Sequence, residues 1–137
     1  MLESRVRSIF EKARFVEELG IKLTKVSDGS VETELAIRDS FRQQHGFIHA
    51  GVIATLGDHT AGGAARTVTG DKDVITIEFK INFLRPAKGN KLKCVGKVLR
   101  GGKQIAIAEA EIFDVDGKEE KLVAKLTETL SVIEPRD

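Results

Sequence analysis

Tryptophan and tyrosine are absent from the sequence, and Cys94 is its single cysteine. One thiol cannot form an internal disulfide, as expected of a chain that works in the reducing cytoplasm. A run of about 18 apolar residues is also missing, and charged residues begin at Glu3, so we expect neither a membrane span nor a secretory signal. These absences predict a cytoplasmic protein that does not associate with membranes.

An excess of one charge is missing as well. The chain has 22 Lys and Arg against 21 Asp and Glu, and the basic residues are scattered along it. Proteins that bind nucleic acid usually gather basic residues into a patch, so nucleic acid is not an expected partner. With 137 residues, the chain is long enough for one domain with a substantial core. We therefore expect a single domain over residues 1–137, in which residues 1–18 form an N-terminal helix.

Hydrophobic spacing predicts an α+β fold. After the helix at 2–18, alternating residues indicate two strands around Asp28-Gly29, a dipeptide typical of tight hairpins. A helix beginning near His49 comes next, and four further strands follow it. The expected strands are 21–27, 30–38, 75–83, 90–100, 103–115 and 121–133. Because the connections are too short for parallel crossovers, an antiparallel sheet of five to six strands should wrap around one long central helix.

The most informative motif is His49-Ala-Gly, followed nine positions after the histidine by Asp58. The intervening segment is small or apolar, and burying an unpaired carboxylate there would cost several kcal/mol or force it to take up a proton. Two interpretations stay open at this point. Asp58 is either a structural group that caps a turn or pairs with a base, or a functional carboxylate.

The start of the same helix offers hydrogen-bond donors. Backbone N–H groups of a first helical turn, here near Ala50 and Gly51, lack acceptors within the helix and carry the positive end of its dipole. Such donors suit a carbonyl oxygen that gains negative charge during a reaction. Gly57, Gly62 and Gly63 each cost about 1 kcal/mol relative to alanine in a helix, which indicates that another backbone or a ligand approaches closely.

These residues resemble a known family. The pattern Gln43-x5-His49-x-Gly51-x6-Asp58, followed by Asn-Phe-Leu-Arg-Pro-Ala at 82–87, is similar to hotdog-fold acyl-CoA thioesterases of the phenylacetate-pathway (PaaI-like) type. The resemblance extends over roughly residues 10 to 133. It implies that Asp58 is the nucleophile or general base, that the Ala50 N–H binds the thioester oxygen, and that Gln43 faces the thioester or the attacking water.

Three positions depart from the family pattern. Ala50 replaces the first glycine of the usual His-Gly-Gly. One branch of the family has a glutamate with a hydroxyl four residues later, where this chain has Asp58 and Gly62. Another branch takes a hydroxyl from the strand after the helix, where Thr76 stands. This mixture does not assign the chain to one substrate branch.

The other polar candidates are weaker. His45, His49 and His59 with Asp58 could be considered metal ligands, but Gly46 interrupts helical spacing between the first two, and no metal is expected. We expect His49 to orient the turn through a hydrogen bond to the backbone, with a direct chemical role as the alternative. Cys94 lies in an alternating strand, where a small core residue is the simplest interpretation.

Three basic residues stand at loops or hairpins. Lys88, Arg100 and Lys103 are either solvated charges or a clamp for the phosphates of CoA, since cationic donors match phosphate well.

The expected function is hydrolysis of an acyl-CoA thioester without metal or redox cofactor. The acyl carbonyl would accept hydrogen bonds from Ala50 and Gly51, while Asp58 attacks it or deprotonates a water held by Gln43 or Thr76. One alternative is a non-catalytic acyl-CoA-binding hotdog module, which would not need a carboxylate at Asp58. Another is a hotdog hydratase or dehydratase, although the proline-rich helix entry of that branch is missing. The absence of a Gly-x-Ser-x-Gly motif argues against an α/β-hydrolase.

Helix geometry adds an expectation about assembly. Nine helical residues place Asp58 roughly 13 Å along the axis from His49, too far for both to reach one carbonyl carbon. Asp58 should therefore meet the Ala50 N–H of a second copy across a two-fold axis. The family resemblance implies a homotetramer built as a dimer of dimers.

Overall fold

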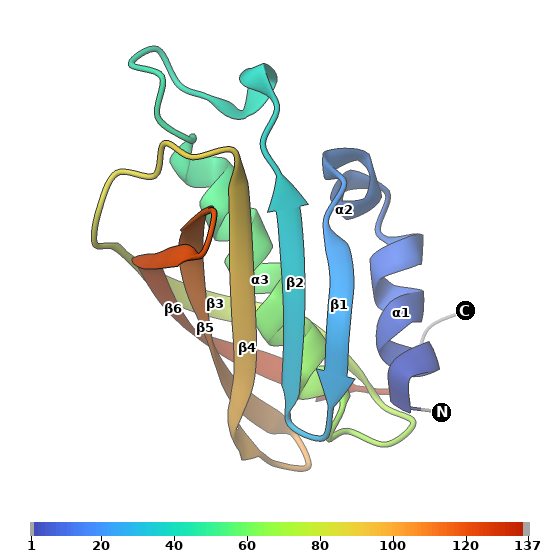
Figure 1. Cartoon of the computed structure of the whole chain (residues 1–137). Helices are drawn as coiled ribbons and strands as arrows, with labels where there is room; N and C mark the ends of the chain where they lie inside the picture. Colours follow the sequence, from blue (N-terminus) through green and yellow to red (C-terminus); the bar gives the residue numbers. More distant parts are fainter. Residues whose placement is uncertain (1, 136–137) are drawn as a thin grey trace.

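The computed structural model describes residues 2–135, which form an antiparallel sheet wrapped along one long helix (Figure 1). The predicted α+β architecture is confirmed, with six strands. The helices are α1 (Leu2–Lys12), α2 (Arg14–Leu19) and α3 (Ala50–Arg66), and a 3-10 turn, η1, covers Asp39–Phe41. The strands are β1 (Lys22–Ser27), β2 (Ser30–Ala36), β3 (Asp73–Phe83), β4 (Lys91–Gly101), β5 (Ile105–Asp116) and β6 (Glu119–Ile133).

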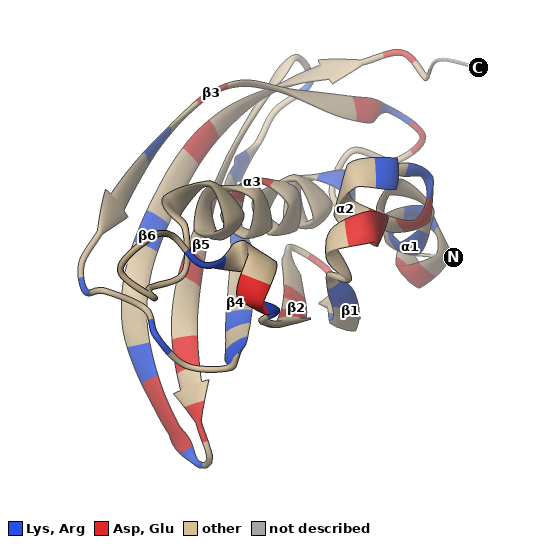
Figure 2. Ribbon diagram, turned by 90° about the horizontal axis from the view of Figure 1, so that it is seen from above, with Lys and Arg blue, Asp and Glu red and all other residues tan. Residues whose placement is uncertain are grey.

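The strand order is β1-β2-β4-β5-β6-β3, and every neighbouring pair is antiparallel. β1 and β2 form the predicted hairpin, in which Gly29 adopts a φ of 81°. β3 follows α3 in the chain but pairs with β6, so it lies at the opposite edge of the sheet from β1. The curved sheet surrounds α3 on one side, as the view in Figure 2 shows.

The N-terminal segment differs from the prediction of one helix over residues 1–18. The chain leaves helical geometry at Ala13, with φ −82° and ψ 93°, so α1 and α2 are separate; residue 1 lies outside the described part. Alanine is the best intrinsic helix former, so local propensity does not cause this break. The bend allows Phe10 of α1 and Val16 of α2 both to be buried in the core. Tertiary packing therefore overrides the helical periodicity.

The helix α3 lies so close to the sheet that only small residues fit at one crossing. A Cβ atom on Gly96 of β4 would lie 2.7 Å from the backbone oxygen of Thr60. Thr60 is fully buried and shares a hydrogen bond of 2.7 Å with Thr33 of β2. This contact sets the height of α3 above the sheet. No helix within residues 2–135 is long and apolar enough to cross a bilayer.

The edge strand β3 exposes an apolar surface. Ile75, Ile77, Phe79 and Phe83 are 51%, 56%, 41% and 48% exposed in the single chain. Among the strands of residues 2–135, β3 pairs only with β6, so its other edge carries backbone groups that no strand pairs. Soluble proteins usually cover or charge such an edge, and this one carries large apolar side chains instead.

Candidate active site

The start of α3 is organised by His49. This residue is the N-cap, and its Nδ1 accepts a hydrogen bond of 2.8 Å from the Gly51 N–H. The expectation that His49 orients the turn through the backbone is therefore confirmed. The same contact corrects the expectation for Gly51: its N–H is already used, so it does not serve as a second donor to a substrate carbonyl. Within the described residues, no acceptor is found for the Ala50 N–H, which remains the available donor.

Gln43 lies beside this helix start, but much of its hydrogen-bonding capacity is used locally. Its Oε1 accepts the N–H groups of His45 and Phe47, at 2.5 and 3.3 Å. The side chain thus closes the turn before α3, and an attacking water would have to be held by its amide NH₂ rather than by Oε1. An oxygen that already accepts two N–H groups is poorly placed to accept from water. The side-chain amide NH₂ remains free to donate.

A groove of about 460 Å³ opens at the helix start. Its lining includes the polar side chains of Gln43, His49 and Arg85, together with Ala50, whose backbone N–H is the free donor. The remaining lining is apolar and comes from the segment before α3, from α3 itself and from the end of β3: Phe47, Ile48, Ile53, Phe83, Leu84, Pro86 and Ala87. A largely apolar cleft with one free backbone donor in its lining has the composition of a small-molecule site.

Asp58 lies two turns further along α3, in a different cavity. Its Oδ1 accepts a hydrogen bond of 2.8 Å from the Thr76 hydroxyl on β3. Both residues line a small cavity of about 130 Å³, which also involves Asp73 and Gly62. No residue is shared between this cavity and the groove at Ala50. Eight helical residues separate Ala50 from Asp58 by about 12 Å along the axis, so one chain does not bring the donor and the carboxylate together.

His59, next to Asp58, is held by the N-terminal helix. Its ring meets the edge of Phe10 with centroids 4.4 Å apart, and it hydrogen-bonds to the backbone of Ile9. Burial lowers the pKa of His59, against the opposing effects of Asp58 and of the Ile9 hydrogen bond. The ring is therefore neutral at pH 7. Its buried Nε2 has no partner among the described residues, and it is not a counter-ion for Asp58.

The sequence analysis missed one carboxylate, Glu128 on β6. This side chain is fully buried, and neither oxygen has a hydrogen-bond donor within residues 2–135. Burial, followed by a hydrogen bond and charge repulsion from Asp58, raises the pKa of Glu128 to about 10. A signal was present in the sequence: Glu128 takes the inward position between Leu126 and Leu130 in an alternating strand.

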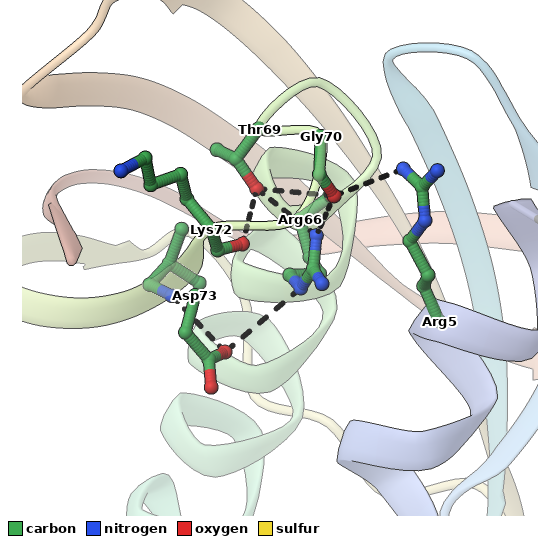
Figure 3. Close-up of polar contacts among 7 residues, drawn as sticks. Arg5, Arg66, Thr69, Gly70, Lys72 and Asp73 are labelled. Carbon is green, nitrogen blue, oxygen red and sulfur yellow. Dashed lines mark hydrogen bonds and ion pairs between the residues drawn. The ribbon is translucent and has the colours of Figure 1, made fainter. Parts of the chain in front are cut away.

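Hydrogen bonds and an ion pair hold the loop that joins α3 to β3. Arg66, at the end of α3, donates to the Thr69 hydroxyl and the Gly70 oxygen and pairs with Asp73 at the start of β3 (Figure 3). Arg5 of α1 donates to the same Gly70 oxygen. These contacts tie α1, α3 and β3 together directly beside the Asp58 cavity.

The three basic residues considered for CoA binding do not come together in one chain. Lys88 precedes β4, near the start of α3, where the neighbouring Ala87 oxygen accepts the Ile48 N–H. Arg100 and Lys103 lie at the β4–β5 hairpin, at the other end of β4 (Figure 1). A strand of that length separates the two ends by about 30 Å. A single protomer therefore cannot clamp one phosphate group with all three.

The remaining candidates from the sequence are Cys94 and a metal site. Cys94 is fully buried beside Thr33 and Thr60, and burial raises the pKa of its thiol to about 12. Such a thiol is not a nucleophile at neutral pH, so the expectation of a core residue holds. Within residues 2–135, no three His, Cys, Asp or Glu side chains are arranged to hold a metal ion.

Comparison with known families gives the site its context. The Thioesterase superfamily matches residues 45–121, more than half of the chain and the segment that includes the helix start and Asp58. The chain belongs to the thioesterase superfamily. The resemblance found in the His49–Asp58 motif is thus confirmed.

Two relatives are similar over most of their length. A Saccharolobus solfataricus protein provisionally named an esterase is 36% identical over 114 residues, which cover 82% of this chain and 81% of the relative. The 1,4-dihydroxy-2-naphthoyl-CoA hydrolase of Listeria monocytogenes is 27% identical over 121 residues, covering 88% and 96%.

Solved structures agree with the fold. A thioesterase family protein from Silicibacter pomeroyi has a TM-score of 0.94 at 31% identity, covering 98% of this chain and 100% of the other. The E. coli PaaI protein from the phenylacetic acid degradation operon has a TM-score of 0.87 at 20% identity, covering 96% and 93%. The architecture of this superfamily member is therefore the hotdog fold.

Proposed function

We propose that this superfamily member hydrolyses acyl-CoA thioesters in a site built from two protomers. The observation that carries the proposal is the division of α3. An unpaired donor, the Ala50 N–H, lies at the groove, and an oriented carboxylate, Asp58, lies in a separate cavity two turns away. Each half lacks what the other provides.

A two-fold axis would join the halves. If two α3 helices run antiparallel, Asp58 of each chain faces the helix start of the other, and the dimer has two identical sites. The apolar edge strand β3 supports this arrangement, because pairing two such edges would cover Ile75, Ile77 and Phe79 and satisfy the free backbone groups. Two dimers would then form a tetramer.

In the proposed reaction, the Ala50 N–H donates to the thioester oxygen as negative charge develops there. Asp58 either attacks the carbonyl carbon or takes a proton from the attacking water. Thr76 donates to Oδ1 and so orients the carboxylate of Asp58. Water adds to the acyl carbon, the carbon–sulfur bond breaks, and a free acid and the CoA thiol are released.

The acyl group is expected to occupy the apolar groove. Its lining by Phe47, Ile53 and Phe83 suits an apolar or aromatic acyl group. An aromatic acyl-CoA deserves priority because the Listeria relative is named a 1,4-dihydroxy-2-naphthoyl-CoA hydrolase. Arg100 and Lys103, which lie close together at one hairpin, remain the candidates for the CoA phosphates, and Lys88 would serve a different region.

Thiol release from a panel of aryl, hydroxyaryl and aliphatic acyl-CoA substrates tests the proposal. A disulfide reagent that changes colour on reacting with free CoA gives a continuous assay, and Asp58→Asn serves as the inactive control. Turnover that depends on Asp58 supports the enzyme. Acyl-CoA binding without thiol release across the panel would favour the non-catalytic binding module instead.

A further inference from the structure

Glu128 is a buried ionisable group that the proposed reaction does not use. It lies on β6 opposite Ala108 of β5 and Phe79 of β3, with no exposed surface. Its Oε2 lies against α3 at Gly62, where an added Cβ would be 3.9 Å away. The carboxyl group of Glu128 thus packs against α3 one turn beyond Asp58.

The charges around Glu128 are all of the same sign. Asp58 from α3 and Glu78 from β3 face it, and both raise its pKa through charge repulsion, in addition to burial and to the hydrogen bond with Asp58. His59, the residue after Asp58 on α3, has a pKa lowered by burial and is neutral. No ion pair to Glu128 is found in the described part of the chain. An ionised Glu128 would be an uncompensated buried charge, which proteins avoid by neutralising the group.

A neutral Glu128 can do what an ionised one cannot. A carboxylate only accepts hydrogen bonds, whereas a protonated carboxyl has one O–H to donate. Asp58 lies within hydrogen-bonding reach and is an acceptor when ionised. Two ionised carboxylates side by side are both acceptors, so an ionised Glu128 has no hydrogen-bond partner among residues 2–135. Once Glu128 carries a proton, Asp58 is its acceptor.

We propose that Glu128 is a positioning residue that keeps its proton and donates its O–H to the Asp58 carboxylate. Asp58 is then held by two donors from two strands, Thr76 on β3 and Glu128 on β6. The two contacts fix the plane of the carboxylate, and they divide the pair into one neutral and one ionised group. This role rests on the proposed function of Asp58.

Infrared spectroscopy tests the protonation of Glu128 independently of any activity. At pH 7 the wild-type protein should show the carbonyl stretch of a protonated carboxylic acid. That band should vanish in Glu128→Gln, persist in the matched control Glu78→Gln, and shift in Asp58→Asn, which replaces the charged acceptor. A wild-type spectrum without the band, or a band that survives Glu128→Gln, would overturn the proposal.

Kinetics test the donation. Glu128→Gln retains a donor, so kcat should stay within about threefold, whereas Glu128→Met keeps the volume without a donor and should lower kcat about tenfold or more. KM should change less than about twofold in both variants, since the interaction acts on the catalytic carboxylate. Equal kcat values for the Gln and Met variants would show that Glu128 does not act by donation.

The two sets of measurements separate the failures. If no acyl-CoA is hydrolysed, the proposed function is wrong, but the infrared band and its shift in Asp58→Asn still report on the Glu128–Asp58 hydrogen bond. If Glu128→Met does not fold, the comparison of wild type, Glu128→Gln and Asp58→Asn in the infrared decides the question. If hydrolysis depends on Asp58 while the band is missing, only the role of Glu128 is wrong.

Discussion

The Thr76 hydroxyl donates a hydrogen bond of 2.8 Å to Asp58 Oδ1, joining a strand to a helix across 18 residues of sequence. The contact fixes the position of one oxygen of the carboxylate. Thr76→Val, which removes the hydroxyl at similar size, should therefore lower kcat by about tenfold, the effect of one lost hydrogen bond to a charged group. Thr76→Ser keeps the donor and should remain near wild type in the thiol-release assay.

Removing the charge of Asp58 should have a larger effect. Asp58→Asn is expected to reduce kcat by at least about 100-fold with little change in KM, because it removes a group needed for proton transfer or attack. Steady-state kinetics on the best acyl-CoA measures both parameters. A variant with unchanged kcat would exclude Asp58 as nucleophile or base.

The shared site predicts complementation. Ala50→Pro removes the N–H donor at a position where proline is tolerated in a helix, and it should be inactive, as should Asp58→Asn. A mixed dimer contains one site with Asp58 from one chain and Ala50 from the other, so refolding the two variants together should restore part of the activity. Both variants must fold and mix, which an affinity tag on one of them reports. Mixed dimers without activity would contradict the two-chain site.

If the β3 edge is covered in the assembly, a charge placed on that edge should disrupt the assembly. Ile77 of β3 is 56% exposed in the single chain, and Ile77→Lys, which places a cation on this edge strand, should dissociate the assembly toward the 15.0 kDa chain. Phe15→Lys on α2, at an apolar position that is 63% exposed and away from β3, is the matched control and should leave the assembly intact. Analytical ultracentrifugation at micromolar concentration distinguishes the species. A wild-type protein that sediments as a single chain would contradict the proposed dimer.

The raised pKa of Glu128 predicts how the free energy of unfolding depends on pH. Its pKa rises from an ordinary value of 4.5 to about 10 in the folded chain, so between those limits the folded state retains a proton that the unfolded state has released. Raising the pH therefore favours unfolding, by at most about 1.4 kcal/mol per pH unit.

The window from pH 7 to about 8 isolates this effect, because His59 is already neutral there and the Cys94 thiol of the unfolded chain is still largely protonated. The free energy of unfolding should fall with pH in the wild type relative to Glu128→Gln, measured by denaturant titration at one protein concentration. Parallel curves for the two proteins would mean that Glu128 does not retain its proton on folding.

The sequence by itself determined much of the local structure. Asp28-Gly29 predicted the hairpin because residues with positive φ are needed there, and Gly29 adopts such a φ. The turn-forming residues before His49, with Gly46 among them, predicted the start of α3, and His49 is the N-cap of that helix. The apolar stretch around Asp58 singled out that carboxylate, because burying a charge without a partner is costly.

Only the tertiary structure decided which groups meet. The break at Ala13 depends on burying Phe10 and Val16 together, and no local propensity reports it. The Gly51 N–H is not available to a substrate, because it donates to Nδ1 of the His49 ring. Alternation along β6 places Glu128 inward, but its partner, Asp58, lies 70 positions away and is brought to it by the curvature of the sheet around α3. Contacts between distant segments depend on the register and curvature of the whole sheet, which a local pattern of residues does not contain.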